Sequence, residues 1–181
     1  MIRVTSDYLK KGDLALLKRF CNFVMLKMVK PAVLRKANIS IRIIKNEDLD
    51  HTDDVMDLKD YGAWVIYEGI VDGKRKFNVV LNARRLNGKA KKPLYRIKKL
   101  MYDVAHELVH IKQYLNNELF DYVDGKARYK GQVFHSGHSD DLEKYFDSPW
   151  EIEAYGREYG LYKVFVKKIK KELKEKAKRE S

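Results

Sequence analysis

The chain has 181 residues but only one cysteine, Cys21. A single cysteine excludes an internal disulfide, and it also excludes a zinc site built from several cysteines, such as a zinc ribbon. We expect Cys21 to be a buried thiol in a protein that works in a reducing compartment.

Long hydrophobic runs are absent as well. Residues 1–11 hold no apolar stretch that could serve as a signal peptide. The most apolar run, 20–29, is interrupted by Asn22 and Lys27 and is too short to span a membrane. The chain also shows no internal repeats. These absences predict a soluble cytoplasmic protein with no membrane span.

Acidic residues are outnumbered, because 26 Asp and Glu stand against 38 Lys and Arg, a net charge of +12. Residues 163–181 hold nine Lys and Arg and three Glu, so a net +6, half of the total, lies there. A second basic cluster lies within 89–99. Neither region has the interleaved aromatic residues of a single-strand binding platform. We interpret both mainly as solvated surface, and nonspecific nucleic-acid contact is the alternative.

Only three prolines occur, and each stands where a helix is expected to begin or break. Apolar residues at three- and four-residue spacing predict a helix over 13–36, which Pro31 kinks or restarts. Pro93 opens a long second helix. Pro149 opens a last helix that continues into the lysine-rich tail.

The segments between these helices contain the predicted strands. An acidic loop is expected over 46–60, and 120–147 has little regular pattern apart from a possible hairpin around Gly125. Strands are predicted over 39–44, 63–71 and 76–81, the last two joined by a hairpin turn at Asp72-Gly73-Lys74. The whole chain is therefore predicted to be one α+β domain over 1–181. In it, a small mixed or antiparallel sheet packs against an N-terminal, a middle and a C-terminal helix, and 163–181 form a basic helical extension.

The middle helix carries the most informative motif, His106-Glu107-Leu108-Val109-His110. Residues four apart lie on one face of a helix, so His106 and His110 can point their imidazoles at one metal ion. Glu107 then lies beside a water bound to that metal. Histidine ligands in a tetrahedral site favour zinc, and we predict one Zn²⁺ per chain.

A catalytic zinc site needs a third protein ligand. The extended motif with a glycine and a third histidine is excluded, because Gln113 and Asn116 occupy those positions. The remaining candidates follow later in the chain. Ser148 and Glu151 have the spacing of a capping box, which would occupy the Glu151 side chain and leave Glu153 as the ligand. Spacing alone leaves these two open, and His135 and His138 are further candidates.

Two segments resemble a known family. His106–Tyr114, HELVHIKQY, and Ser148–Glu158, SPWEIEAYGRE, are similar to small zinc metallopeptidases common in bacteriophage genomes, relatives of the SprT-like and minimal gluzincin groups. The resemblance covers about residues 94–160. It implies a zincin-like fold of the gluzincin type, hydrolysis of peptide bonds in a protein or peptide substrate, and a location in the host cytoplasm.

The resemblance also selects a third ligand. In gluzincins a ligand glutamate is followed three residues later by alanine, which corresponds here to Glu151 and Ala154. Tyr155 stands where many gluzincins carry Asp or Asn that contacts a ligand histidine. SprT-like proteins use a downstream histidine instead, which His138 beside Gly137 weakly matches.

The remaining roles follow from the proposed chemistry. Glu107 is the expected general base, taking a proton from the attacking water and passing it to the leaving amine. Asp103 and Tyr114 are placed to orient the ligand histidines, as Tyr155 also is. The oxyanion could be bound by Tyr155 or by one of three others: Tyr145, His135 and His138.

Two alternatives to a working peptidase remain. One is a basic protein associated with nucleic acid, including a protease that acts on DNA-bound proteins. The other is a degenerate zincin that keeps the motif as a binding module. For a peptidase, residues 77–81 are our candidate for the sheet edge that pairs with an extended substrate.

Overall fold

A computed structural model describes residues 1–45, 62–86, 90–135 and 142–180. The predicted acidic loop and His138 lie outside these residues. The helices are α1 (Lys11–Met28), α2 (Pro31–Leu34), α3 (Pro93–Arg96), α4 (Lys98–Leu115), α5 (Leu142–Asp147) and α6 (Pro149–Glu180), with a 3₁₀ turn over Ala83–Arg85. The strands are β1 (Ile2–Ser6), β2 (Ala37–Ile44), β3 (Ala63–Val71), β4 (Lys74–Asn82), β5 (Leu119–Asp121), β6 (Lys126–Tyr129) and β7 (Gln132–His135).

The main sheet is mixed and has the strand order β1-β2-β4-β3. Strands β1, β2 and β4 are parallel, and β3 pairs antiparallel with β4. The predicted hairpin is confirmed, because Asp72 and Gly73 both have positive φ, which matches the right-handed twist of the flanking strands. Along β2 buried residues alternate with more exposed ones, so one face of the sheet carries the core.

Two predictions about this sheet were wrong. Strand β1 was missed, because its only buried apolar residues are Ile2 and Val4, too few to establish an alternating pattern. Residues 77–81 were expected at the edge, but β4 lies between β2 and β3 and its side chains there are largely buried. The edge strand next to the motif helix is β3.

The helices near two of the prolines are shorter and more numerous than predicted. The helix expected over 13–36 ends at Met28, and Pro31 begins the separate short helix α2. Lys30 is extended (φ −59°, ψ 137°), as expected for a residue before proline. Pro93 likewise opens only α3, and Ile97 (φ −103°, ψ 13°) separates it from α4.

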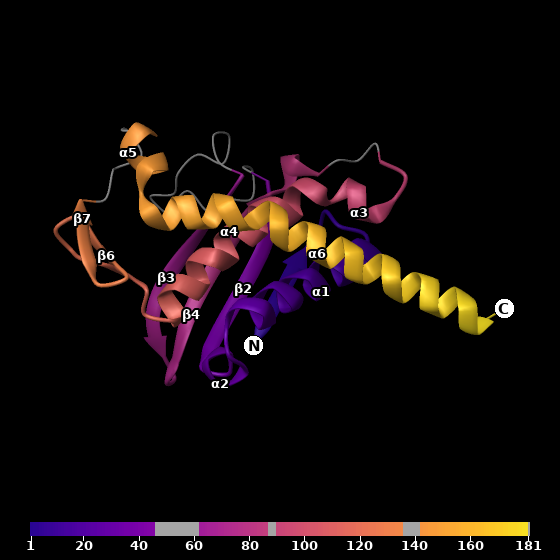
Figure 1. Cartoon of the computed structure of the whole chain (residues 1–181), viewed down its shortest axis with the longest axis horizontal. Coiled ribbons are helices and arrows are strands. Elements are labelled where there is room, and N and C mark those ends of the chain that lie inside the picture. Colours follow the sequence, from indigo (N-terminus) through magenta and orange to yellow (C-terminus); the bar gives the residue numbers. More distant parts are fainter. Residues whose placement is uncertain (46–61, 87–89, 136–141, 181) are drawn as a thin grey trace.

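The helices form two further layers over the sheet (Figure 1). Helices α1 and α4 pack against the sheet, and α6 lies across α4 and α1. The predicted C-terminal helix thus contacts mainly the other helices, and not the sheet as expected. The core joins all three layers: Phe20 of α1 meets Phe165 of α6 edge to face at 5.1 Å, and both belong to the same buried cluster as Ile41 of β2.

A second, three-stranded antiparallel sheet, β5-β6-β7, follows α4. The predicted hairpin around Gly125 is confirmed, but the rest of 120–147 is more regular than expected. A second turn at Lys130-Gly131, both with positive φ, joins β6 to β7. This sheet forms its own small core, in which Tyr129 packs against Trp150 of α6.

Helix α6 continues without a break into the basic tail, whose first part is not a separate extension. Phe165 and Ile169 are buried in the core and Glu172 pairs with Arg19 of α1, whereas the C-terminal end of the helix projects from the body of the molecule (Figure 1). Among the described residues no helix is both long and apolar enough to cross a bilayer.

Candidate metal centre

Helix α4 places His106 and His110 one turn apart on the same face, as the motif predicts. The two imidazoles are nearly perpendicular, with ring centroids 4.8 Å apart, and their Nε2 atoms are 3.1 Å apart. Both residues are buried, with 6% and 7% of their surface exposed.

The first turn of α6 brings Glu151 to these two nitrogens. Its Oε2 lies 3.1 Å from Nε2 of His106, and its Oε1 lies 3.3 Å from Nε2 of His110. Ala154, one turn further on, is fully buried, so its small side chain permits the close approach of α6 to α4. Glu153, the other candidate in this turn, points elsewhere.

The capping-box alternative for Glu151 does not hold. The Ser148 hydroxyl donates to the carbonyl of Lys144 at 2.9 Å, and the Ser148 amide donates to the carbonyl of Tyr145 at 3.1 Å. The Ser148 amide, which a capping-box glutamate would bond, is therefore engaged elsewhere, and the Glu151 carboxylate is directed at the histidines.

His106, His110 and Glu151 have the donor set and spacing of a zinc site. In a tetrahedral zinc site with bonds near 2.0–2.1 Å, neighbouring donor atoms lie about 3.3 Å apart, close to the three separations observed here. Within the described residues, these three form a group whose ligand atoms all lie within 4.8 Å of one another. A divalent cation would also offset the cost of burying so many ionisable groups together.

His106, His110 and Glu151 strongly shift one another's pKa values. Burial alone would lower the pKa of both histidines, but the Glu151 carboxylate raises the pKa of each of them. Conversely, burial alone would raise the pKa of Glu151, but the bonds from His106 and His110 hold it well below its ordinary value. A metal ion binds the neutral imidazole and the ionised carboxylate, so metal binding by these three residues would depend on pH.

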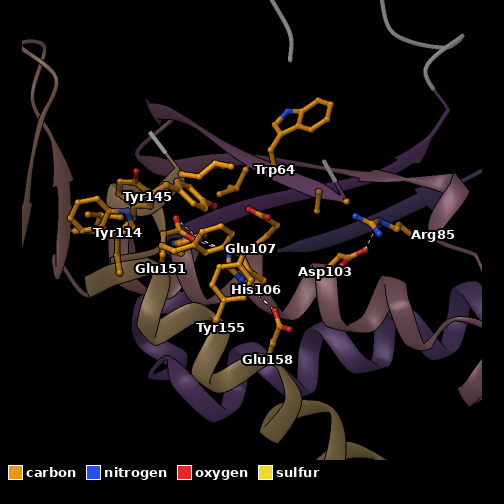
Figure 2. A pocket seen from close by; sticks show the side chains of 18 of the residues that line it. Trp64, Arg85, Asp103, His106, Glu107, Tyr114, Tyr145, Glu151, Tyr155 and Glu158 are labelled. Carbon is orange, nitrogen blue, oxygen red and sulfur yellow. Dashed lines mark hydrogen bonds and ion pairs between the residues drawn. The ribbon is translucent and has the colours of Figure 1, made fainter. Parts of the chain in front are cut away.

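Glu107 stands next to this group and points into a cavity of about 740 Å³ (Figure 2). Only 6% of its surface is exposed, and burial raises the pKa of its carboxyl. Figure 2 shows Asp103 and Arg85 at one end of the cavity and Tyr114 and Tyr145 at the other. A buried carboxylate beside the donor group is placed to exchange a proton with a molecule in the cavity.

Two residues that sequence reasoning missed contact the outer nitrogens of the histidines. Gln113 Oε1 lies 3.0 Å from Nδ1 of His110. Glu158 Oε2 lies 3.4 Å from Nδ1 of His106, an ion-pair distance longer than a good hydrogen bond. Their spacing could have signalled both, because Gln113 follows His110 by three residues and Glu158 follows Glu151 by seven, two helical turns.

Of the residues predicted to orient the histidines, Asp103 and Tyr114 bond to other partners, and only Tyr155 contacts a candidate ligand. Asp103 pairs with Arg85 at 3.6 Å instead of bonding His106. The Tyr114 hydroxyl donates to Asp121. The Tyr155 ring packs edge to face against His106, with centroids 4.4 Å apart, so it holds the imidazole by contact and not through a carboxylate.

The alternative ligands are not part of the group. Glu153 accepts hydrogen bonds from Lys112 at 2.7 Å and from Tyr129 at 2.5 Å. Burial alone would raise the pKa of Glu153, but these bonds lower it to about 2. His135 is exposed at the end of β7, and His138 lies outside the described residues.

Of the candidates for binding an oxyanion, two tyrosines line the cavity. The Tyr145 hydroxyl lies near the Glu151 carboxylate, and the Tyr155 hydroxyl lies near Tyr145. Burial and the nearby Glu151 charge raise the pKa of both hydroxyls, so both are protonated donors at neutral pH.

Comparisons with known proteins add no relative to this picture. No protein-family model, no curated protein and no solved structure matches this chain significantly. The function is therefore argued from the site alone.

Proposed function

We propose that this protein is a zinc-dependent metallopeptidase of the zincin-like, gluzincin type. One observation carries the proposal: the ligand atoms of His106, His110 and Glu151 converge, and the buried Glu107 carboxylate stands beside them at an open cavity. A structural metal site needs no such carboxylate and is closed to solvent.

In this proposal each side chain has one task. Bound zinc supplies a water that is nucleophilic near neutral pH and polarises the substrate carbonyl. Glu107 takes the proton of the attacking water and delivers it to the leaving amine nitrogen. Tyr145 and Tyr155, as protonated donors on the cavity wall, are the candidates for a hydrogen bond to the carbonyl oxygen as it becomes negatively charged.

The cavity suits an extended chain. Ala63, Trp64 and Val65, the first residues of the edge strand β3, line it opposite the motif helix. An edge strand can pair with a peptide through main-chain hydrogen bonds, which favours a protein or peptide substrate.

The first test is metal content. The purified protein, Glu151→Ala and Glu153→Ala are dialysed against zinc and then against buffer, and bound metal is measured by elemental analysis. We expect one zinc per chain in the unaltered protein and in Glu153→Ala, and loss of zinc in Glu151→Ala. Absence of zinc from the unaltered protein would contradict the proposal.

The second test is hydrolysis. An unstructured protein such as casein and a mixed fluorogenic peptide library are incubated with the zinc-loaded protein, with the Glu107→Gln variant and with a chelator. Cleavage by the unaltered protein alone supports a peptidase. If all three preparations leave both substrates intact while zinc is bound, the degenerate zincin becomes the better account.

The exposed end of α6 supports one further candidate function, contact with nucleic acid. Residues 170–180 carry six Lys and Arg and three Glu, and nearly all of them are exposed. Retention of DNA that falls steeply with salt and survives loss of zinc would favour this role.

A further inference from the structure

Gln113 is a fully buried polar side chain that contacts both helices of the metal centre. Its Oε1 lies 3.0 Å from Nδ1 of His110 on α4. Its Nε2 donates to the carbonyl of Trp150 at 3.0 Å and to Oε2 of Glu153 at 3.2 Å, both on α6. One side chain therefore links a candidate ligand histidine to the turn that carries Glu151.

The bonding pattern determines which way the Gln113 amide points. Both groups facing its nitrogen, the Trp150 carbonyl and the Glu153 carboxylate, can only accept hydrogen bonds. A flipped amide would set its oxygen against two oxygen atoms, so the observed orientation is the one the network requires. The oxygen of Gln113 must then face His110.

This orientation decides the tautomer of His110. An amide oxygen only accepts, so Nδ1 of His110 must be the donor. In a neutral imidazole the proton on Nδ1 leaves the lone pair on Nε2. That nitrogen is the one that faces Nε2 of His106 and Oε1 of Glu151.

The other end of the same amide acts on α6. Trp150 immediately precedes Glu151, and Glu153 is held by Lys112 and Tyr129. Loss of the Gln113 bond to the Trp150 carbonyl would remove one of the contacts that hold the first turn of α6, where Glu151 stands. Each histidine has one contact at its outer nitrogen, Nδ1. The contact of His110 with Gln113, at 3.0 Å, is a better hydrogen bond than the 3.4 Å contact of His106 with Glu158.

We propose that Gln113 is a positioning residue of the metal centre: it fixes the His110 tautomer that presents Nε2 to the metal and holds the first turn of α6 so that Glu151 meets both histidines. This inference rests on the proposed function, because it requires that the three residues bind metal.

The test compares metal affinity between variants. Zinc and cobalt affinities are measured by competition with a chromophoric chelator for the unaltered protein, for Gln113→Leu and for the control Gln132→Leu, an exposed glutamine on β7. We expect Gln113→Leu to bind about 10- to 100-fold more weakly. The visible spectrum of bound cobalt should also shift, whereas Gln132→Leu should match the unaltered protein.

A second variant separates positioning from general destabilisation. Gln113→Glu keeps an acceptor for His110, but it loses the donor to the Trp150 carbonyl. It also places a new carboxylate next to that of Glu153. Its metal-free form should unfold at a lower temperature, yet its zinc affinity should stay closer to that of the unaltered protein than that of Gln113→Leu. If Gln113 had a purely structural role, the loss of zinc affinity would parallel the fall in unfolding temperature in both Gln113→Leu and Gln113→Glu. Such a parallel would overturn the inference.

The possible failures are distinguishable. If Gln113→Leu is folded and binds zinc and cobalt as tightly as the unaltered protein, the positioning role is wrong but the metal centre stands. If the unaltered protein binds neither metal, the proposed function and this inference both fall.

Discussion

Glu151 and Glu158 of α6 contact the same imidazole, that of His106, from its two different nitrogens. Glu151 Oε2 lies 3.1 Å from Nε2, and Glu158 Oε2 lies 3.4 Å from Nδ1. The two glutamates are seven residues apart, so they share one face of the helix (Figure 2). One helix thus supplies both a candidate metal ligand and a carboxylate at ion-pair distance from a second candidate ligand.

Replacing Glu158 should therefore weaken metal binding without abolishing it. We expect Glu158→Gln to lower zinc affinity by about tenfold, the low end of the roughly 10- to 100-fold contribution of groups that contact a ligand histidine, because the Glu158 contact is long. Chelator competition measures the effect, and Glu175→Gln, an exposed position on the same helix, is the matched control. If both variants lost the same zinc affinity, the cause would be the changed charge of the helix and not the contact of Glu158 with His106.

Glu107 should be dispensable for metal and necessary for turnover. Its carboxylate is absent from the convergent donor group, so Glu107→Gln should retain one zinc per chain. Loss of a general base typically lowers turnover by about 10²- to 10⁴-fold. Elemental analysis and peptide hydrolysis on the same preparation check both halves, and a variant that loses its zinc would make Glu107 a ligand instead.

Glu153 should matter for stability and not for metal. It joins Lys112 of α4 to Tyr129 of β6 and Arg157 of α6. Removing it leaves the nearly buried Lys112 with Glu118 as its remaining carboxylate partner, so Glu153→Ala should lower the free energy of unfolding by about 1–3 kcal/mol. Denaturant titration measures this change at constant zinc. Loss of zinc from a folded Glu153→Ala protein would contradict the assignment of Glu151.

Cys21 should make the protein less stable at high pH. Burial raises the pKa of its thiol from 9.0 to about 12. The unfolded chain therefore releases this proton at a lower pH than the folded chain. Between about pH 9 and 12 the free energy of unfolding should fall by up to about 1.4 kcal/mol per pH unit on this account.

Denaturant titrations of the unaltered protein and of Cys21→Ala at pH 8, 9 and 10 isolate this contribution, because lysines and tyrosines titrate in both. The stability difference between the two proteins should shrink above pH 9. A difference that stays constant across this range would show that the thiol is not shielded in the folded protein.

The end of α6 should be separable from the rest of the molecule. Residues 174–180 are all exposed and include four Lys and Arg. Removing residues 174–181 should leave zinc affinity and the unfolding temperature unchanged while reducing retention on a polyanion such as heparin. A marked fall in the unfolding temperature would instead indicate that this segment packs against the domain.

Local pattern in the sequence determined much of this arrangement. Helical periodicity put His106 and His110 on one face of α4, and the Asp72-Gly73 turn gave the hairpin of β3 and β4. The serine and proline before Glu151 marked the start of α6 correctly. These features depend on residues within one or two turns of each other, where spacing and backbone preference decide the outcome.

Contacts between distant segments were decided only by the tertiary structure. Spacing could not choose between Glu151 and Glu153, because both lie in the first turn of α6 and the choice depends on how α6 crosses α4. The same crossing brings Trp150 to Gln113 and Glu158 to His106. The order of the sheet, with β4 inside and β3 at the edge, depends on the pairing of β4 with β2, a strand that precedes it by about 30 residues in the chain. The local sequence does not decide which face of a helix, or which edge of a strand, meets a partner. That choice is made by packing against segments that are far away in the chain.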